Sequence, residues 1–86
     1  MRLAIIAVGA LLASAATAEA QSCYDLWYQR NAIFKSAGYC FRTRQAIAEF
    51  GNAGCHYDDE RDVPLSVRAR QRVESLRAQE RRYGCR

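Results

Sequence analysis

The chain has 86 residues, 50% of them hydrophobic and 26% charged, and a formal net charge of +4 at pH 7. So short a chain forms at most one small domain, and a single core of that size rarely contributes more than about 3–5 kcal/mol of stability. These residues are therefore expected to form one small domain, and the absence of internal repeats and low-complexity segments after residue 20 excludes a repeat array within them.

Residues 1–20 have the pattern of a secretory signal peptide. Arg2 precedes an apolar run from Leu3 to Ala16, and small residues end the segment at Ala18-Glu19-Ala20. A membrane-spanning helix needs about 20 apolar residues, so this run is too short for a comfortable span. We expect Sec-type export, cleavage after Ala20 and a soluble periplasmic or secreted domain of residues 21–86. An uncleaved anchor and lipidation at Cys23 are the disfavoured alternatives.

The first predicted helix runs from Ser22, which begins a capping box with Asp25, to Gly38, a residue suited to follow a helix end. At 100° per residue, one arc of this helix is apolar and is expected to face the core: Cys23, Leu26, Trp27, Ile33, Phe34 and Ala37. Arg30 interrupts this arc. A buried guanidinium needs carboxylates or carbonyls, so we expect Arg30 to pair with Glu49 or with the acidic residues 58–62. Binding of an anionic ligand is the alternative.

Two further helices are predicted. The shorter has Thr43 as its N-cap, spans residues 44–50 with Ile47 and Phe50 facing the core, and ends at Gly51. The longer follows Pro64 with Ser66 as its N-cap and runs to about Tyr83. Its inward stripe is interrupted by Glu80 and consists of Ala69, Val73, Leu76 and Tyr83. No segment alternates with the period of a strand, so the sequence predicts an all-α, three-helix domain.

The segment RNAIFKSAGYCF, residues 30–41, resembles the YARHG domain, a small bacterial extracytoplasmic module. The matching positions are Arg30, Asn31, Phe34, Gly38, Tyr39 and Phe41. The resemblance covers about Ser22 to Gly54, and Ser36 and Ala37 stand where the family's name motif has arginine and histidine. It implies an exported helical module of largely undefined activity, and the cysteines are an addition to the pattern.

The four cysteines, Cys23, Cys40, Cys55 and Cys85, are all in the expected mature domain. No C-x-x-C pair is present, which disfavours zinc and redox-active sites, and an even count in an exported domain predicts two structural disulfides. If the three helices run up, down and up, the pairs are Cys23–Cys55 and Cys40–Cys85, which we favour. The rival arrangement is Cys40–Cys55 with Cys23–Cys85.

Catalysis and metal binding have little support in the sequence. His56 is the only histidine, and it is next to a cysteine that we expect to be in a disulfide. The acidic run from Asp58 to Asp62 lacks the spacing of an EF-hand loop. We therefore expect no enzyme, no cofactor and no bound metal.

Binding is the expected function. Arg70, Arg77 and Arg81 of the third helix are candidate ligand-binding residues, because guanidinium groups bind carboxylates and phosphates in bidentate fashion. In the alternative, Glu74 and Glu80 pair with arginines of the same helix, and these arginines then form a solvated helix surface and not a binding site. Tyr24 and Tyr28 are a candidate protein-contact patch.

The expected partner is an anionic cell-envelope component or an acidic exported protein, with no nucleic acid, no membrane span and a monomeric chain. An inhibitor or partner of a secreted protein is the alternative, and a cationic membrane-active protein is a weaker one.

Overall fold

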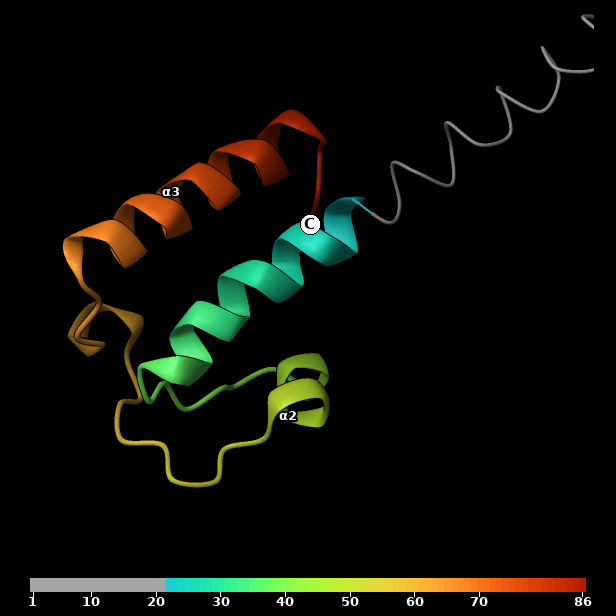
Figure 1. The fold of residues 1–86 in the computed structure, drawn as a ribbon. Helices are drawn as coiled ribbons and strands as arrows, with labels where there is room; N and C mark the ends of the chain where they lie inside the picture. The colour runs from blue at the N-terminus through green and yellow to red at the C-terminus, as the bar shows by residue number, and fades with distance from the viewer. Residues whose placement is uncertain (1–21) are drawn as a thin grey trace, which may run out of the picture.

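A computed structural model describes residues 22–86, which contain three α-helices, one short 3-10 helix and no strand (Figure 1). The first helix occupies residues 22–36, and it is followed by α2 (Arg44–Phe50), η1 (Glu60–Asp62) and α3 (Val67–Arg82). The predicted all-α, three-helix class is confirmed. No helix within these residues is both long enough and apolar enough to cross a membrane. The predicted signal peptide, residues 1–20, lies outside the described residues.

The first helix and α3 lie side by side and run in opposite directions (Figure 1). The Cys23–Cys85 disulfide joins the first helix, near its N-terminal side, to the residues that follow α3, with a Cα–Cα distance of 5.5 Å. The second disulfide, Cys40–Cys55, closes the segment that contains α2. The two predicted disulfides are thus present, but the favoured pairing, Cys23–Cys55 with Cys40–Cys85, is wrong.

The physical reason for this error is the length of α2. Its 7 residues rise only about 10 Å, whereas the 16 residues of α3 rise about 24 Å at 1.5 Å per residue. A helix as short as α2 cannot return the chain to the starting end of the first helix. The return is made by α3, which brings Cys85 to Cys23 and leaves Cys40 and Cys55 to pair locally.

The core lies where the first helix meets α3 and the segment around α2. Its buried cluster consists of Phe34, Phe41, Ala46, Val63 and Val73. Leu26 and Leu76 are also buried, and Leu76 is fully inaccessible to solvent. Trp27, Ile33 and Ala37, three residues of the predicted arc, pack against the cluster as half-buried side chains. The inward faces predicted for the first helix and α3 are therefore largely those observed.

The ends of α2 and α3 follow their capping residues. The Thr43 hydroxyl accepts a hydrogen bond from the Ala46 amide at 3.2 Å, and the Ser66 hydroxyl accepts one from the Ala69 amide at 3.0 Å. Each bond satisfies an amide that has no partner within its helix. Residue 22 is already helical, and residue 21 is not described, so the capping box predicted to begin at Ser22 stays a prediction.

Two residues predicted to face the core are exposed instead. Ile47 is 43% exposed because α2 contacts the core through the smaller Ala46. Tyr83 is 49% exposed because α3 ends at Arg82, so the helical period no longer governs where Tyr83 points.

Candidate functional site

Arg30 forms a half-buried ion pair with Glu80 of α3. Its Nε donates to Glu80 Oε1 at 2.7 Å and its Nη2 donates to Oε2 at 3.1 Å, with side chains 20% and 14% exposed. The predicted partners, Glu49 and the acidic residues 58–62, are wrong because the antiparallel α3 brings Glu80 opposite Arg30. A bidentate pair of this kind fixes the register of two helices. Arg30 is thus committed to a structural contact.

The aromatic residues of the family motif form a chain of ring contacts inside the domain. Phe34 contacts Tyr39 with ring centroids 5.6 Å apart, and Tyr39 contacts Phe41 edge-on at 5.2 Å. Phe41 in turn stacks on Phe50 of α2 at 5.2 Å. Phe34 and Phe41 are buried. These rings join the first helix to α2.

The two small motif residues shape the backbone. Asn31 is buried and donates from Nδ2 to the Trp27 carbonyl at 2.9 Å. Gly38 has φ of +93°, a conformation that other residues rarely adopt, and its carbonyl accepts from the amides of His56 and Tyr57 at 2.7 and 3.1 Å. The turn at Gly38 thereby holds residues 56–57 against the end of the first helix.

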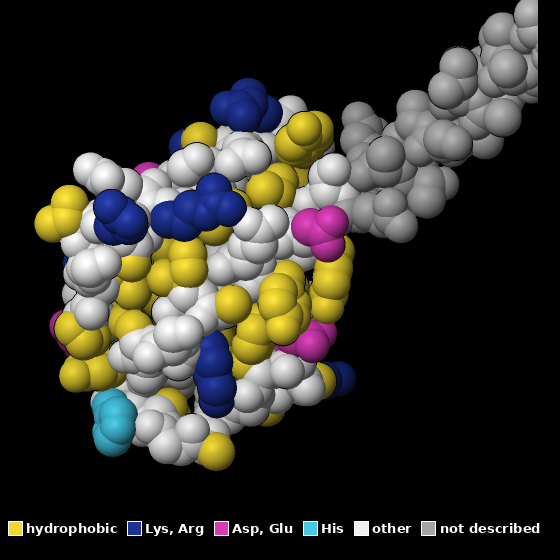
Figure 2. Space-filling model, in the orientation of Figure 1, with side chains coloured by type: hydrophobic (Ala, Val, Ile, Leu, Met, Phe, Trp, Pro, Cys, Tyr) yellow, Lys and Arg dark blue, Asp and Glu magenta, His cyan; other side chains and the backbone are white. Residues whose placement is uncertain are grey.

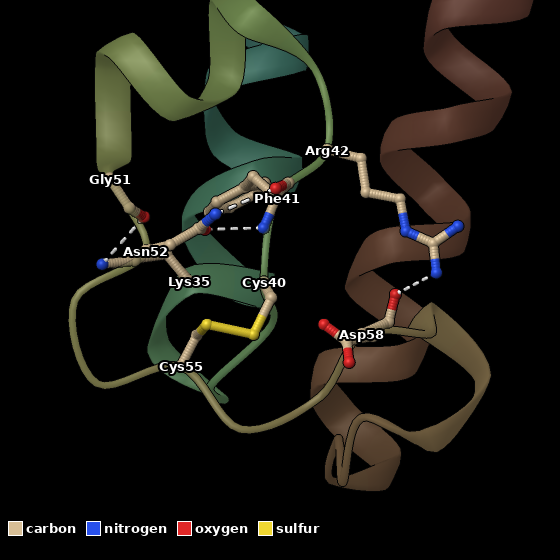
Figure 3. Close-up of a disulfide and its surroundings, with 8 residues drawn as sticks. All are labelled: Lys35, Cys40, Phe41, Arg42, Gly51, Asn52, Cys55 and Asp58. Atoms are coloured by element: carbon tan, nitrogen blue, oxygen red, sulfur yellow. Dashed lines mark hydrogen bonds between the residues drawn. A yellow bond between two sulfur atoms is a disulfide. The ribbon is translucent and has the colours of Figure 1, made fainter.

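Residues 40–55, which we call the clasp, are closed by one disulfide and by paired hydrogen bonds (Figure 3). The Asn52 side chain accepts from the Phe41 amide at 2.7 Å and donates to the Phe41 carbonyl at 2.9 Å. Lys35 of the first helix donates to the Gly51 carbonyl at 3.2 Å. Arg42, which belongs to the clasp, donates to the carbonyl of Asp58 in the following loop at 2.7 Å. The clasp therefore positions Arg42 beside the loop that follows it.

A groove of about 390 Å³ lies between α3 and the loop of residues 58–65. Its apolar lining comes from three parts of the chain: Phe34, Tyr39, Leu65 and Val73. Phe34 and Val73 are buried members of the core, so the floor of the groove is continuous with the packed interior. The volume is within the range of about 300–1,000 Å³ that is usual for ligand pockets.

The walls of the groove carry equal numbers of positive and negative side chains. These are the four arginines and four carboxylates Arg42, Arg61, Arg70, Arg77, Asp58, Asp59, Glu60 and Glu74. Arg77 bonds Glu60 across the groove at 2.8 Å, and its guanidinium carbon lies 6.0 Å from the centre of the Phe34 ring. One ion pair thus links the loop to α3, and the groove has no net formal charge.

The loop also contains its own ion pair. Arg61 Nη2 lies 2.7 Å from Asp59 Oδ2, and the Arg61 amide donates to Asp59 Oδ1 at 2.9 Å. These side-chain and backbone hydrogen bonds from Arg61 lower the pKa of Asp59 to about 2, and the same side-chain contact raises the pKa of Arg61. Asp59 is the N-cap of η1, so this contact holds the loop in a defined shape.

The three candidate ligand-binding arginines do not all lie together. Arg70 and Arg77 line the groove, whereas the exposed Arg81 lies outside its lining. Within residues 22–86, Arg77 is the one arginine of α3 that forms an ion pair, and neither Arg70 nor Arg81 does. The alternative in which Glu74 and Glu80 neutralise the arginines of their own helix is not observed, since Glu80 bonds Arg30 and Glu74 has no ion pair among these residues.

Tyr24 and Tyr28 lie on the exposed side of the first helix, 46% and 41% exposed. The Tyr24 hydroxyl donates to Glu49 Oε1 of α2 at 2.8 Å, which raises the pKa of Tyr24. Tyr28 packs on Phe50 with ring centroids 5.0 Å apart. Both tyrosines therefore also connect the first helix to α2.

The remaining chemical candidates stay apart. His56 is exposed and packs beside Tyr57 at 6.2 Å between ring centroids. Within residues 22–86 no three side chains among histidines, cysteines and carboxylates are grouped as metal ligands would be. The groove is the concave feature that brings together two of the predicted site residues, Arg70 and Arg77.

Comparison with known families identifies the domain. A family model described as the YARHG domain matches residues 2–81. The chain belongs to the YARHG domain family. The resemblance drawn from residues 22–54 is thereby confirmed and extended along the chain. No curated protein and no solved structure matches the chain. Membership of the YARHG family and two disulfides are consistent with an extracytoplasmic location.

Sequence reasoning missed part of the groove. Arg42 was not singled out, although it directly follows the motif residue Phe41, and Glu60 was considered only as a member of the acidic run 58–62. Their position depends on the clasp and on the path of the loop, neither of which has a periodic signal. A charged residue next to a buried aromatic at the end of a motif was the one sequence signal that pointed to Arg42.

Proposed function

We propose that this YARHG domain is an exported binding module of the bacterial cell envelope, acting in the periplasm or beyond, and that it binds an anionic envelope component through α3. The proposal involves binding without catalysis. Its ligand is a polymer or surface that carries carboxylates or phosphates, the groups that guanidinium side chains bind best.

The observation that carries the proposal is the unpaired charge of α3. Four exposed arginines of α3 that lie outside the groove lining, which we call the arginine surface, form no ion pair within residues 22–86: Arg68, Arg72, Arg81 and Arg82. Arg72 donates to the neutral Gln29 at 2.6 Å, which leaves its charge uncompensated. Figure 2 shows several dark blue side chains over α3, a helix whose basic residues are all arginines.

The placement of Glu80 strengthens this argument. A helix with six arginines and two glutamates could neutralise part of its own charge through contacts between residues three or four apart. Here Glu80 is turned inward to Arg30. The charge that an isolated helix would compensate is therefore presented to solvent, where it attracts anions over about 8–10 Å at moderate salt.

The test is co-sedimentation of the oxidised, exported protein with isolated cell envelope and with purified peptidoglycan, at low salt and at about 0.15 M. We expect binding that persists at the higher salt. Arg68→Gln and Arg82→Gln should each weaken it about threefold, the usual size of one exposed charge contact.

Arg44→Gln is the matched control for Arg68→Gln. Each arginine is exposed, lies in the first turn of its helix and forms no ion pair among the described residues. We expect the control to bind like the wild type. Equal losses of binding in Arg68→Gln and Arg44→Gln would mean that binding depends only on net charge, which would overturn the role of α3. If the protein sediments at neither of the two salt concentrations, the proposed function itself is overturned.

A further inference from the structure

The groove between α3 and residues 58–65 carries unpaired charges of both signs in equal number. The arginine surface lacks this property, because all of its charges are positive. Two internal ion pairs, Arg77–Glu60 and Arg61–Asp59, account for half of its charged side chains. The other half, consisting of Arg42, Arg70, Asp58 and Glu74, form no ion pair within residues 22–86.

From this arrangement we infer that the groove is a binding site for a short zwitterionic peptide, one that carries both a carboxylate and an ammonium group. The site is separate from the arginine surface and goes beyond the proposed function. A carboxylate of the peptide is bound by Arg42 or Arg70, and its ammonium group is bound by Asp58 or Glu74. A peptide meets both requirements at once because its ends have opposite charges.

A purely anionic ligand fits the groove poorly. It would gain contact with Arg70 but would also approach Glu74, four residues further along α3, and like charges at close range oppose binding. A purely cationic ligand meets the reverse difficulty at Arg42 and Arg70. The arginine surface, in contrast, has no carboxylate paired with it, which separates the ligand chemistry of the two sites.

The floor supplies the apolar contact that a peptide side chain needs. The half-buried Tyr39 and Leu65 present this apolar surface, and Phe34 and Val73 lie buried behind it as members of the core. The volume of about 390 Å³ lies near the lower end of the range for ligand pockets. This size suits a short peptide better than a folded partner.

The walls are held in place before any ligand arrives. The Arg77–Glu60 contact at 2.8 Å ties α3 to the loop, and the Arg42 bond to the Asp58 carbonyl at 2.7 Å ties the loop to the clasp. The contact between Asp59 and Arg61 fixes the shape of the loop between them. A site whose walls are already ordered loses less entropy on binding.

The experiment follows backbone amide signals of the full oxidised domain by NMR during titration with three probes. The first is the tripeptide Ala-Glu-Lys with free ends, and the second is acetyl-Ala-Gln-Gln-amide, which has no charge. The third is dextran sulfate, which is purely anionic. We expect the free tripeptide to shift amides around Arg42, Asp58 and Glu74, with affinity at least tenfold above that of the neutral peptide.

Variants on α3 separate the groove from the arginine surface. Arg70→Gln and Glu74→Gln each remove one exposed groove charge and should weaken tripeptide binding about threefold to fivefold. Arg81→Gln, on the same helix but outside the groove, is the matched control and should bind the tripeptide like the wild type.

Equal binding of the charged and neutral peptides would overturn the inference, as would dextran sulfate shifting the groove amides as strongly as the tripeptide. No shift with any peptide would overturn it as well. These results are distinguishable from failure of the proposed function, which depends on envelope binding by the arginine surface. Peptidoglycan fragments that keep their peptide stems, compared with the free tripeptide, then distinguish a cell-wall source from free peptides.

Discussion

The helix pair and the clasp are stabilised in contrasting ways. The first helix and α3 are joined by contacts between residues far apart in sequence, namely the Cys23–Cys85 disulfide with a separation of 62 and the Arg30–Glu80 pair with a separation of 50. The clasp is closed by contacts of short range, the Cys40–Cys55 disulfide with a separation of 15 and the Asn52–Phe41 bonds with a separation of 11.

This difference matters because both regions contribute residues to the groove, whose other wall is the loop of residues 58–65. The helix pair provides Arg70, Glu74 and Arg77 on α3, and the clasp provides Arg42. Local contacts can order the clasp early, since closing a short loop costs less entropy than closing a long one. The groove is complete only when both regions are formed, so it depends on the long-range contacts most.

Removal of each disulfide should have the largest effects and should sharpen the contrast. In the chain-entropy model, a loop of 62 residues is worth about 4 kcal/mol and one of 15 residues about 3 kcal/mol. Cys23→Ser/Cys85→Ser should therefore lower the free energy of unfolding more than Cys40→Ser/Cys55→Ser. Chemical denaturation followed by circular dichroism measures both. The reverse order would mean that the clasp, not the helix pair, limits stability.

The next largest effect is expected at the ion pair of the helix pair. Glu80→Gln leaves the Arg30 guanidinium, 20% exposed, without a carboxylate. Removing one partner of a fully buried pair costs about 3–5 kcal/mol, and partial exposure reduces our expectation to about 2 kcal/mol.

Glu74→Gln is the control for Glu80→Gln, since Glu74 is on the same helix and has no ion pair among residues 22–86; it should change stability by less than about 0.5 kcal/mol. The double variant Arg30→Met/Glu80→Leu should recover most of the loss, because no charge is left unpaired. Equal stability of Glu80→Gln and Glu74→Gln would show that the pair contributes nothing.

The same contrast explains what the sequence could predict. Thr43, Ser66 and Gly51 signal helix ends through their own chemistry, and each is found at the predicted end. The inward positions of Phe34 and Val73 follow from helical period and are also observed. These features depend on residues within a few positions of one another, so they can be read without knowledge of the fold.

Long-range features could not be predicted in this way. The partner of Arg30 and the disulfide pairing both depend on the direction of α3, which follows from the length of α2 and the path of the loop. Arg70 and Arg77 were identified as candidates from the guanidinium chemistry of an arginine-rich helix, and both line the groove. Arg42 was missed, and the pairing of Glu60 with α3 was not predicted, because only the assembled fold brings the clasp and the loop to α3.

A smaller effect should be seen within the clasp. Asn52→Ala removes both hydrogen bonds to the backbone of Phe41, a buried residue. An unsatisfied buried backbone group costs about 1–3 kcal/mol, and solvent can reach this half-buried site in part, so we expect a loss of about 1 kcal/mol.

Asn52→Asp keeps the acceptor and loses the donor, so it should fall between Asn52→Ala and the wild type. Gln45→Ala, at an exposed position of α2, is the control and should be close to neutral. The amide of Phe41 should exchange with solvent faster in Asn52→Ala. Unchanged exchange of that amide would show that the bonds to Asn52 do not close the clasp.

The smallest expected effect concerns the loop that connects the two regions, and it depends on pH. The pKa of Asp59 is lowered from 3.8 to about 2 in the folded domain by its hydrogen bonds from Arg61. Between about pH 4 and pH 2 the unfolded chain therefore binds a proton at Asp59 more readily than the folded domain does. The stabilisation is present above about pH 4 and is lost as the pH falls toward 2.

Asp59→Asn and Arg61→Gln should each flatten the dependence of the unfolding free energy on pH between 4 and 2. Because both side chains are at the surface, the change is expected to be modest and to shrink further with added salt. If both variants keep the wild-type slope of the unfolding free energy against pH, the acid sensitivity of the domain comes from other groups. The Asp59–Arg61 contact would then not determine the shape of the loop.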